Sequence, residues 1–283
     1  MGFEQGGSRS RSILQASGIQ FPKRSHVNPN LNTSTHPIDD SSYVAQCAEQ
    51  LEIHGALVLP DFFTPEAVTE VVAQSKNREG DAFYADSDHN VYITKPNPEL
   101  DDNHPYNRKV VSSKGLIADD EIPADSPLRE VYNDAAFRAF LCGVLGIDEV
   151  YPYDDDLSSI NVHFASEGKE LGWHFDNSSF AVTMLLQAPE SGGQFEYVPD
   201  VRDADAGDMA YDRVASVLDG NEPVNVLDFE PGDLVLFRGR NAMHRVTPTI
   251  GNITRMLVVF AFNDQPGISL SESSMRTFYG RTG

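Results

Sequence analysis

Three residues of the sequence have the chemistry of a metal site: His174 and Asp176, separated by one residue, and the distant His244. Alternate side chains of a strand share one face, so a His-x-Asp pair directs an imidazole and a carboxylate to the same point. A second histidine from another strand would complete the two-histidine, one-carboxylate triad of non-heme Fe(II) oxygenases. Such a triad leaves positions open for a bidentate co-substrate and dioxygen, whereas a fourth protein ligand closes a structural zinc site.

A lone His-x-Asp pair also occurs by chance on polar surface strands, and Arg255 is the residue that favours the metal site. Arg255 begins the segment 255–262, in which all seven remaining residues are apolar. A buried guanidinium requires an anionic partner, because uncompensated burial of a charge is strongly unfavourable. Its planar fork suits bidentate binding of a carboxylate. We therefore expect a dicarboxylate co-substrate whose 2-oxo-acid end chelates iron.

Polar residues on two expected strands are candidates for contacts with the co-substrate or the substrate. In the expected strand 158–165, Asn161 and His163 share one face and apolar residues occupy the other. We expect this polar face to point into the pocket, although both residues could instead be hydrogen-bonded polar residues of the core. The alternation that starts at Arg255 places Asn263 on the pocket face as well.

Two further candidates come from segments without clear periodicity. Residues 81–123 form a polar, Asp- and Asn-rich stretch that is long for an idle connection, and such loops often line active sites. Within it, Arg108 is a candidate to bind a substrate carboxylate, or equally part of a solvated basic turn. Asn177 follows Asp176 directly and should lie at the rim of the site. The acidic segment 199–222 is expected to be an irregular insertion, either a lid or a surface loop.

Helix signals concentrate before the metal-site strands. Asp40 and Thr64 each precede a helical pattern as capping residues, and Gly55 ends the first helix. Two more helices are expected after Ser126 and Asp134. We expect these helices to pack on the outside of the sheets, where their role is structural.

Composition predicts one domain, residues 39–283, preceded by a disordered or loosely draped tail, residues 1–38, that is basic and rich in Ser and Asn. The net charge of −22 argues against binding of nucleic acid or an anionic membrane. No apolar run is long enough to span a bilayer. The two cysteines are expected to be reduced core thiols, which favours a cytoplasmic protein.

The order of the motifs resembles that of the Fe(II)/2-oxoglutarate-dependent dioxygenases. The matching elements are His174-x-Asp176, the turn 191–195, the turn and strand 230–237, His244-Arg245-Val246-x-Pro248 and Gly251-x-x-x-Arg255. The resemblance implies a mainly β protein, a double-stranded β-helix or jelly roll with flanking N-terminal helices. It also implies Fe(II) held by His174, Asp176 and His244, with 2-oxoglutarate and O2 as co-substrates and Arg255 on the distal carboxylate of 2-oxoglutarate.

Within that superfamily, segments 172–177 and 185–189 are most similar to the free-amino-acid radical halogenases and their hydroxylase relatives. The halogenases of that group replace the carboxylate ligand with a small residue, which frees a coordination site for chloride. This chain keeps Asp176. The resemblance therefore implies hydroxylation of a free amino acid or similar small zwitterion, with desaturation, ring closure and epimerisation left open.

The sequence leaves three alternatives open. The same chemistry could act on a peptide or protein side chain, or on another small metabolite. A jelly-roll metalloenzyme such as an isomerase or hydrolase would use no 2-oxoglutarate, but it leaves Arg255 unexplained. A binding protein with a vestigial site is disfavoured, because the three ligand residues and the arginine are all present.

Overall fold

The computed structural model describes residues 28–283. Its α-helices are α1 (Ser41–His54), α2 (Pro65–Arg78), α3 (Pro127–Tyr132), α4 (Ala135–Leu145), α5 (Tyr211–Leu218) and α6 (Glu272–Tyr279). Its strands are β1 (Ala56–Leu59), β2 (Phe83–Asn90), β3 (Lys109–Ile117), β4 (Ile160–Ala165), β5 (Leu171–His174), β6 (Ala181–Gln187), β7 (Ser191–Gly192), β8 (Phe195–Val198), β9 (Asn225–Leu227), β10 (Leu234–Phe237), β11 (Met243–Val246), β12 (Thr249–Ile250) and β13 (Arg255–Phe260). None of the described helices is long and apolar enough to cross a membrane.

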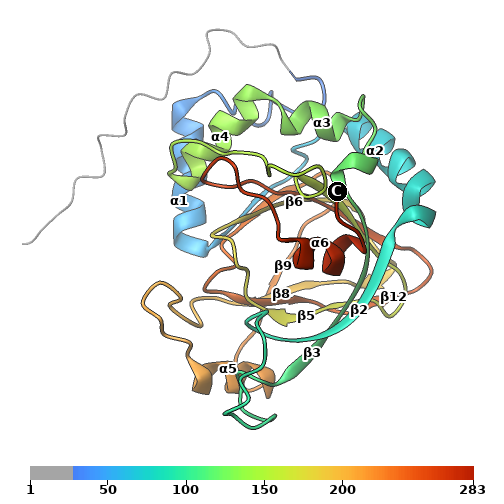
Figure 1. Cartoon of the computed structure of the whole chain (residues 1–283). Helices are drawn as coiled ribbons and strands as arrows, with labels where there is room; N and C mark the ends of the chain where they lie inside the picture. The colour runs from blue at the N-terminus through green and yellow to red at the C-terminus, as the bar shows by residue number, and fades with distance from the viewer. Residues whose placement is uncertain (1–27) are drawn as a thin grey trace, which may run out of the picture.

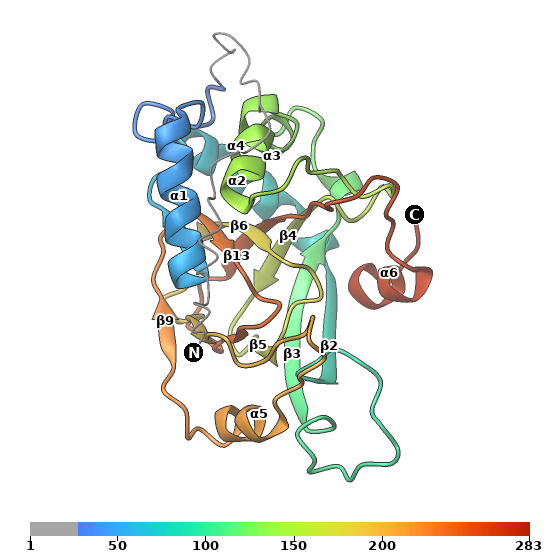
Figure 2. The same ribbon diagram turned by 90° about the vertical axis from the view of Figure 1, so that its left-hand side faces the viewer.

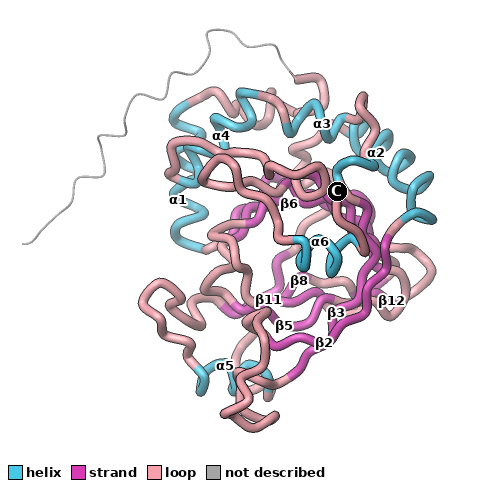
Figure 3. Tube along the Cα trace, in the orientation of Figure 1, coloured by secondary structure: helices cyan, strands magenta, loops and turns pink. Residues whose placement is uncertain are grey.

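The strands form a curled antiparallel sheet in the order β1-β10-β6-β13-β4-β3-β5-β11-β8-β9, and β2 pairs with the outer side of β3. Strands β7 and β12 form a separate two-stranded sheet. Figure 1 and Figure 3 show how the sheet curls so that strands distant along the chain face one another. This is the jelly roll that the sequence predicts, with helices on its outside.

Helices α1 to α4 cover one face of the sheet, as Figure 2 shows. Their apolar residues and the outward residues of β4, β6, β10 and β13 form the main core. The expected caps are confirmed: the side chains of Asp40, Thr64 and Asp134 accept hydrogen bonds from backbone N–H groups of the first turn of α1, α2 and α4. Gly55 ends α1 in the left-handed conformation. Capping therefore fixes where each of these helices begins.

Three segments that showed no clear pattern contain regular structure. Residues 81–123 hold the hairpin of β2 and β3, whose register runs from Phe83 opposite Leu116 to Asn90 opposite Lys109. β2 shows no apolar periodicity, because it is a mostly exposed edge strand. Residues 199–222 contain α5. Beyond residue 266 the Ser-rich sequence predicts no element, and the structure has α6 there.

The expected tail ends earlier than residue 38. Residues 28–38 pack on the domain. Leu31 and Ile38 are buried in the main core. His36 Nε2 donates a hydrogen bond to the carbonyl of Pro60, and His36 Nδ1 is hydrogen-bonded to the hydroxyl of Tyr43. Short apolar anchors separated by polar residues carry no periodicity, so the sequence pattern did not identify them. Residues 1–27, to which the rest of that prediction applies, lie outside the described residues.

Candidate active site

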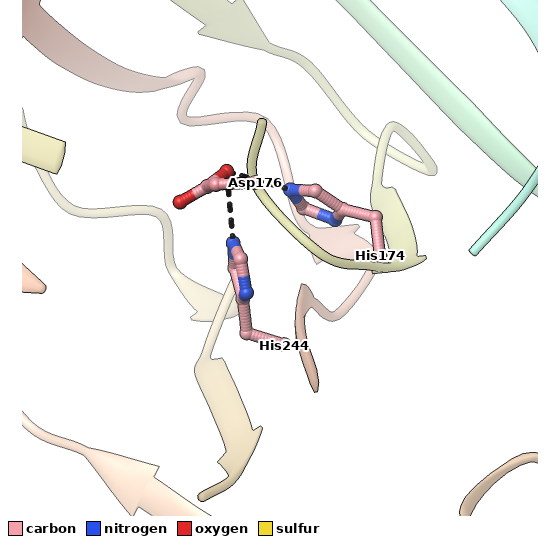
Figure 4. A group of neighbouring side chains, drawn as sticks. All are labelled: His174, Asp176 and His244. Atoms are coloured by element: carbon pink, nitrogen blue, oxygen red, sulfur yellow. Dashed lines mark ion pairs between the residues drawn. The ribbon is translucent and has the colours of Figure 1, made fainter. Parts of the chain in front are cut away.

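The two histidines of the triad lie opposite each other on neighbouring strands. His174 is the last residue of β5, and the antiparallel pairing of β5 with β11 places His244 directly across from it. Their ring centroids are 4.1 Å apart. Asp176 lies just beyond β5, with its Oδ1 3.7 Å from His174 Nε2 and 3.5 Å from His244 Nε2 (Figure 4). One ligand atom from each residue lies within 4.8 Å of the others.

Backbone carbonyl groups fix the orientation of both imidazoles. His174 Nδ1 lies 2.8 Å from the carbonyl oxygen of Gly172, and His244 Nδ1 lies 3.0 Å from that of Ala242. A carbonyl oxygen only accepts, so each Nδ1 carries the proton and each Nε2 presents a lone pair. Both lone pairs face Asp176, which is the arrangement a metal ligand pair requires.

The electrostatics of the site keep His174 and Asp176 in their metal-binding protonation states. Burial, reinforced by His244, lowers the pKa of His174 to about 3. Burial raises the pKa of Asp176, but the attraction of its carboxylate to the imidazolium forms of His244 and His174 and to Lys114 outweighs burial and lowers that pKa to about 2. At neutral pH the site therefore offers neutral imidazole and an ionised carboxylate, as metal binding requires.

Gly239 leaves the space that the triad needs. The backbone N–H of Asp176 donates to the carbonyl of Gly239 at 3.0 Å. A Cβ atom at residue 239 would overlap Asp176 Oδ2 and lie 2.9 Å from His244 Cε1. Only glycine allows the backbone to approach both ligands this closely.

The triad lines a cavity of about 280 Å³ inside the curled sheet. Most of the wall is aromatic or aliphatic, including Phe180, Phe195, Phe229 and Phe237. An apolar wall excludes water from the reacting groups and strengthens the electrostatic interactions of the few polar side chains.

Arg255 lies in the wall of the same cavity. It is the first residue of β13, only 7% exposed, and forms no ion pair with any of the residues 28–283. Burial lowers its pKa to about 10, so the guanidinium stays charged at neutral pH. Gly193, at φ +61°, leaves room for it, because a Cβ there would lie 2.8 Å from Arg255 Cδ. A buried, unpaired cation next to the triad fits an anionic co-substrate.

His163 also lines this cavity, as the strand alternation predicts, and it brings a neighbour that the sequence did not reveal. Lys114 of β3 lies in the wall, with Nζ 3.3 Å from His163 Nδ1. Burial lowers the pKa of Lys114 to about 8, against the opposing effect of Asp176. Burial, together with Lys114 and Arg255, lowers the pKa of His163 well below its usual range. His163 is thus neutral and accepts a hydrogen bond from the ammonium group.

The other four candidates do not line the cavity. Asn161 lies on the expected face of β4, but its amide donates to the carbonyl of Ser158 at 2.8 Å. Asn263 lies beyond the end of β13 and pairs with Tyr151. Asn177 is exposed. Arg108 forms an ion pair with Asp219 at 2.7 Å, which joins the β2–β3 loop to the end of α5.

Sequence reasoning missed Lys114, Glu170 and Gly239. Lys114 and Glu170 line the cavity, but they lie in polar segments whose strand pairing the sequence did not reveal. Gly239 lies two residues after β10, and the sequence does not show that a side chain there would clash with Asp176 and His244. The register of β3 on β4 and β5 is the information that places the first two.

Comparison with known proteins agrees with this geometry. Residues 40–279 match the family described as Halogenase D. No curated protein matches the chain. Solved structures share its fold at low identity. One is an oxidoreductase of the 2OG-Fe(II) oxygenase family from Burkholderia pseudomallei, with 15% identity, a TM-score of 0.50, and coverage of 80% of this chain and 93% of that one.

Two further structures match at similar levels. A prolyl hydroxylase from Trichoplax adhaerens, in complex with a hypoxia inducible factor peptide fragment, is 15% identical over 79% of this chain and 90% of its own, with a TM-score of 0.53. The epimerase SnoN, in complex with Fe3+, alpha ketoglutarate and nogalamycin RO, is 12% identical over 79% and 84%, with a TM-score of 0.54. These likenesses concern the fold. The match to the family profile over most of the chain carries the assignment: this protein belongs to the Halogenase D family, within the Fe(II)/2-oxoglutarate-dependent dioxygenases.

Proposed function

We propose that the protein is a hydroxylase that uses Fe(II), 2-oxoglutarate and O2 to oxidise an unactivated C–H bond of a free amino acid or a similar small zwitterion. The single observation that carries the choice of hydroxylation is the carboxylate of Asp176 between the two histidines, with Oδ1 3.5 Å from His244 Nε2. A chain that keeps this carboxylate ligand leaves no protein-made vacancy for halide, even within a family described as Halogenase D.

In this proposal His174 Nε2, an oxygen of Asp176 and His244 Nε2 hold Fe(II), and Arg255 binds the distal carboxylate of 2-oxoglutarate. When bound, Fe(II) and 2-oxoglutarate supply the activation of dioxygen, with release of succinate and CO2. The chain contributes position and environment. The carbonyl groups of Gly172 and Ala242 keep both imidazoles aimed at the iron site. The phenylalanine-rich wall keeps water from the reacting carbon.

The size and the polar groups of the cavity support a small substrate. About 280 Å³ must hold both the co-substrate and the reacting part of the substrate. Glu170 is the carboxylate of the cavity wall outside the triad, and it forms no ion pair within residues 28–283. It offers a partner for the ammonium group of an amino acid. The strongly negative net charge, −22, is compatible with a substrate that carries an ammonium group.

Incubation of the iron-loaded protein with 2-oxoglutarate, O2 and a panel of free amino acids tests this function. We expect succinate formation to increase with one amino acid or a few related ones, and mass spectrometry should find a product with one added oxygen atom. Product formation on peptides but not on free amino acids would contradict the substrate class. Conversion of a substrate without O2 or 2-oxoglutarate would contradict the reaction class and favour an isomerase or hydrolase.

A further inference from the structure

The cavity contains a second cationic point besides Arg255. The ammonium of Lys114 has three N–H donors, and within residues 28–283 its hydrogen bond is the single one to His163 Nδ1 at 3.3 Å. No carboxylate of the described chain lies within ion-pair distance of it. Lys114 nevertheless lies in the wall of the cavity that the triad lines. Two donors of a partly buried cation therefore remain for a ligand.

Strand pairing places Lys114 and Arg255 on either side of one residue of β4. Leu116 of β3 is opposite His163, and Arg255 of β13 is opposite Ala165. Continuing the first register by two residues places Lys114 opposite Ala165. Ala165 and His163 lie on the same face of β4, and this face lines the cavity. In the strand order, β3 with Lys114 lies next to β5 with His174, and β4 with His163 separates it from β13 with Arg255. The basic groups thus form a row from the triad to Arg255, with Lys114 at the end near Asp176.

This order assigns different carboxylates to the two cations. A 2-oxo dicarboxylate that spans from the triad to Arg255 has its distal carboxylate at Arg255 and the carboxylate adjoining its oxo group near Asp176. We propose that Lys114, held in place by His163, binds this oxo-adjacent carboxylate. Lys114 would then act on every 2-oxo acid, whereas Arg255 acts only on those with a distal carboxylate. The inference rests on the proposed use of 2-oxoglutarate and adds a second determinant of its binding.

Equilibrium binding to the Mn(II)-loaded protein, measured by calorimetry, separates these roles without any turnover. The two probes are 2-oxoglutarate and 2-oxopentanoate, which has a methyl group in place of the distal carboxylate. We expect Lys114→Met to weaken the binding of both by a similar factor, roughly 10- to 100-fold, because each loses the same buried charged contact. Arg255→Met should weaken the binding of 2-oxoglutarate alone, and Lys114→Arg should restore part of the affinity for both probes.

Two controls keep the result specific to Lys114. Lys109→Met removes an exposed lysine of the same strand, whose ion pair with Asp88 is 3.8 Å long, and should change neither affinity. Electron paramagnetic resonance and thermal unfolding of Lys114→Met should show Mn(II) bound and the fold intact. Loss of Mn(II) from that variant would indicate a merely structural role and overturn the proposal.

Three outcomes are decisive for the co-substrate contact. Equal affinity of Lys114→Met and the unmodified protein for both probes would overturn the assignment. Weaker binding of 2-oxoglutarate alone would also overturn it, since Lys114 would then assist Arg255 at the distal carboxylate. Failure of the unmodified protein to bind 2-oxoglutarate would instead refute the proposed function itself.

Discussion

The two ends of the cavity are built on opposite principles. At the metal end, His174 and His244 each have a backbone carbonyl for Nδ1, and the backbone of Asp176 is tied to Gly239. At the basic end, Arg255 has no ion pair within residues 28–283 and keeps its charge in spite of burial. The metal end is therefore pre-organised, whereas the basic end is left incomplete by the chain.

The difference indicates where binding energy comes from at each end. The hydrogen bonds that orient the metal-ligating side chains are already formed before the metal binds. Metal binding therefore costs no further conformational entropy to order these side chains. An unpaired buried cation destabilises the free protein and gains its partner only when an anion binds. Substitutions at the two ends should therefore differ in their effects on stability as well as on binding.

The largest effect is expected from removing the carboxylate at the metal end. Asp176→Ala should reduce the rate of hydroxylation by roughly a thousandfold. Removing one partner of a buried charged interaction costs about 3 to 5 kcal/mol, which corresponds to a rate change of this size. Product analysis with and without chloride checks this, because an opened coordination site would also allow halide transfer. Undiminished hydroxylation would remove Asp176 from the ligand set.

At the basic end, Arg255→Met should weaken 2-oxoglutarate binding by about 2 to 5 kcal/mol. The same substitution should leave the free energy of unfolding of the ligand-free protein unchanged or higher, because it removes an unpaired buried charge. Calorimetry and denaturant unfolding measure the two quantities separately. A large loss of stability together with unchanged affinity for 2-oxoglutarate would show that Arg255 serves the fold and not co-substrate binding.

Gly239→Ala tests whether the metal end depends on backbone space. The added methyl group would meet Asp176 Oδ2 and should lower metal affinity by roughly 10- to 100-fold, as changes around metal ligands commonly do. Gly80→Ala is the matched control, since a Cβ at that residue meets nothing within 4 Å. Equal metal affinity of Gly239→Ala and Gly80→Ala would show that the close approach has no role.

The stability of the metal-free protein should fall as the pH drops from 6.5 toward 5. The folded state lowers the pKa of His174 from its ordinary 6.5 to about 3, so the unfolded chain binds the proton first and acid favours unfolding. The loss over this interval should be about 2 kcal/mol from this residue. Denaturant unfolding at a series of pH values measures it, with His174→Gln as the control that should be less pH-dependent. A flat profile for the unmodified protein would contradict the burial of a neutral imidazole.

The smallest effect is expected from Arg108→Ala. Arg108 lies outside the cavity wall, and its ion pair with Asp219 is partly exposed, so the change in the free energy of unfolding should stay below about 1 kcal/mol. Steady-state kinetics should not change. A rise in the KM for the amino acid substrate would restore Arg108 as a substrate contact.

Much of the fold and the core of the site could be predicted because their signals are local. Asp40, Thr64 and Asp134 mark helix starts by capping chemistry alone. The His-x-Asp pair and Arg255 are unusual residues in apolar surroundings, and strand alternation is enough to turn His163 into the cavity.

What the sequence did not reveal depends on pairing between distant segments. β2 is a polar edge strand, so nothing in its own residues predicts the hairpin that positions Lys114. Alternation placed Asn161 on the correct face but could not foresee that its amide bonds to Ser158 instead of facing the cavity. An arginine can bind a substrate carboxylate, and Arg108 is a candidate for that reason. Its ion pair with Asp219 depends on the position of α5, which the sequence does not predict.

The most direct test of the central claim is an anaerobic visible difference spectrum of the protein with Fe(II) and 2-oxoglutarate, followed by additions of free amino acids. The account predicts a charge-transfer band when 2-oxoglutarate chelates iron at the triad, and a shift of that band with the amino acid that is the substrate. Iron bound to the triad without any band on addition of 2-oxoglutarate would contradict the account.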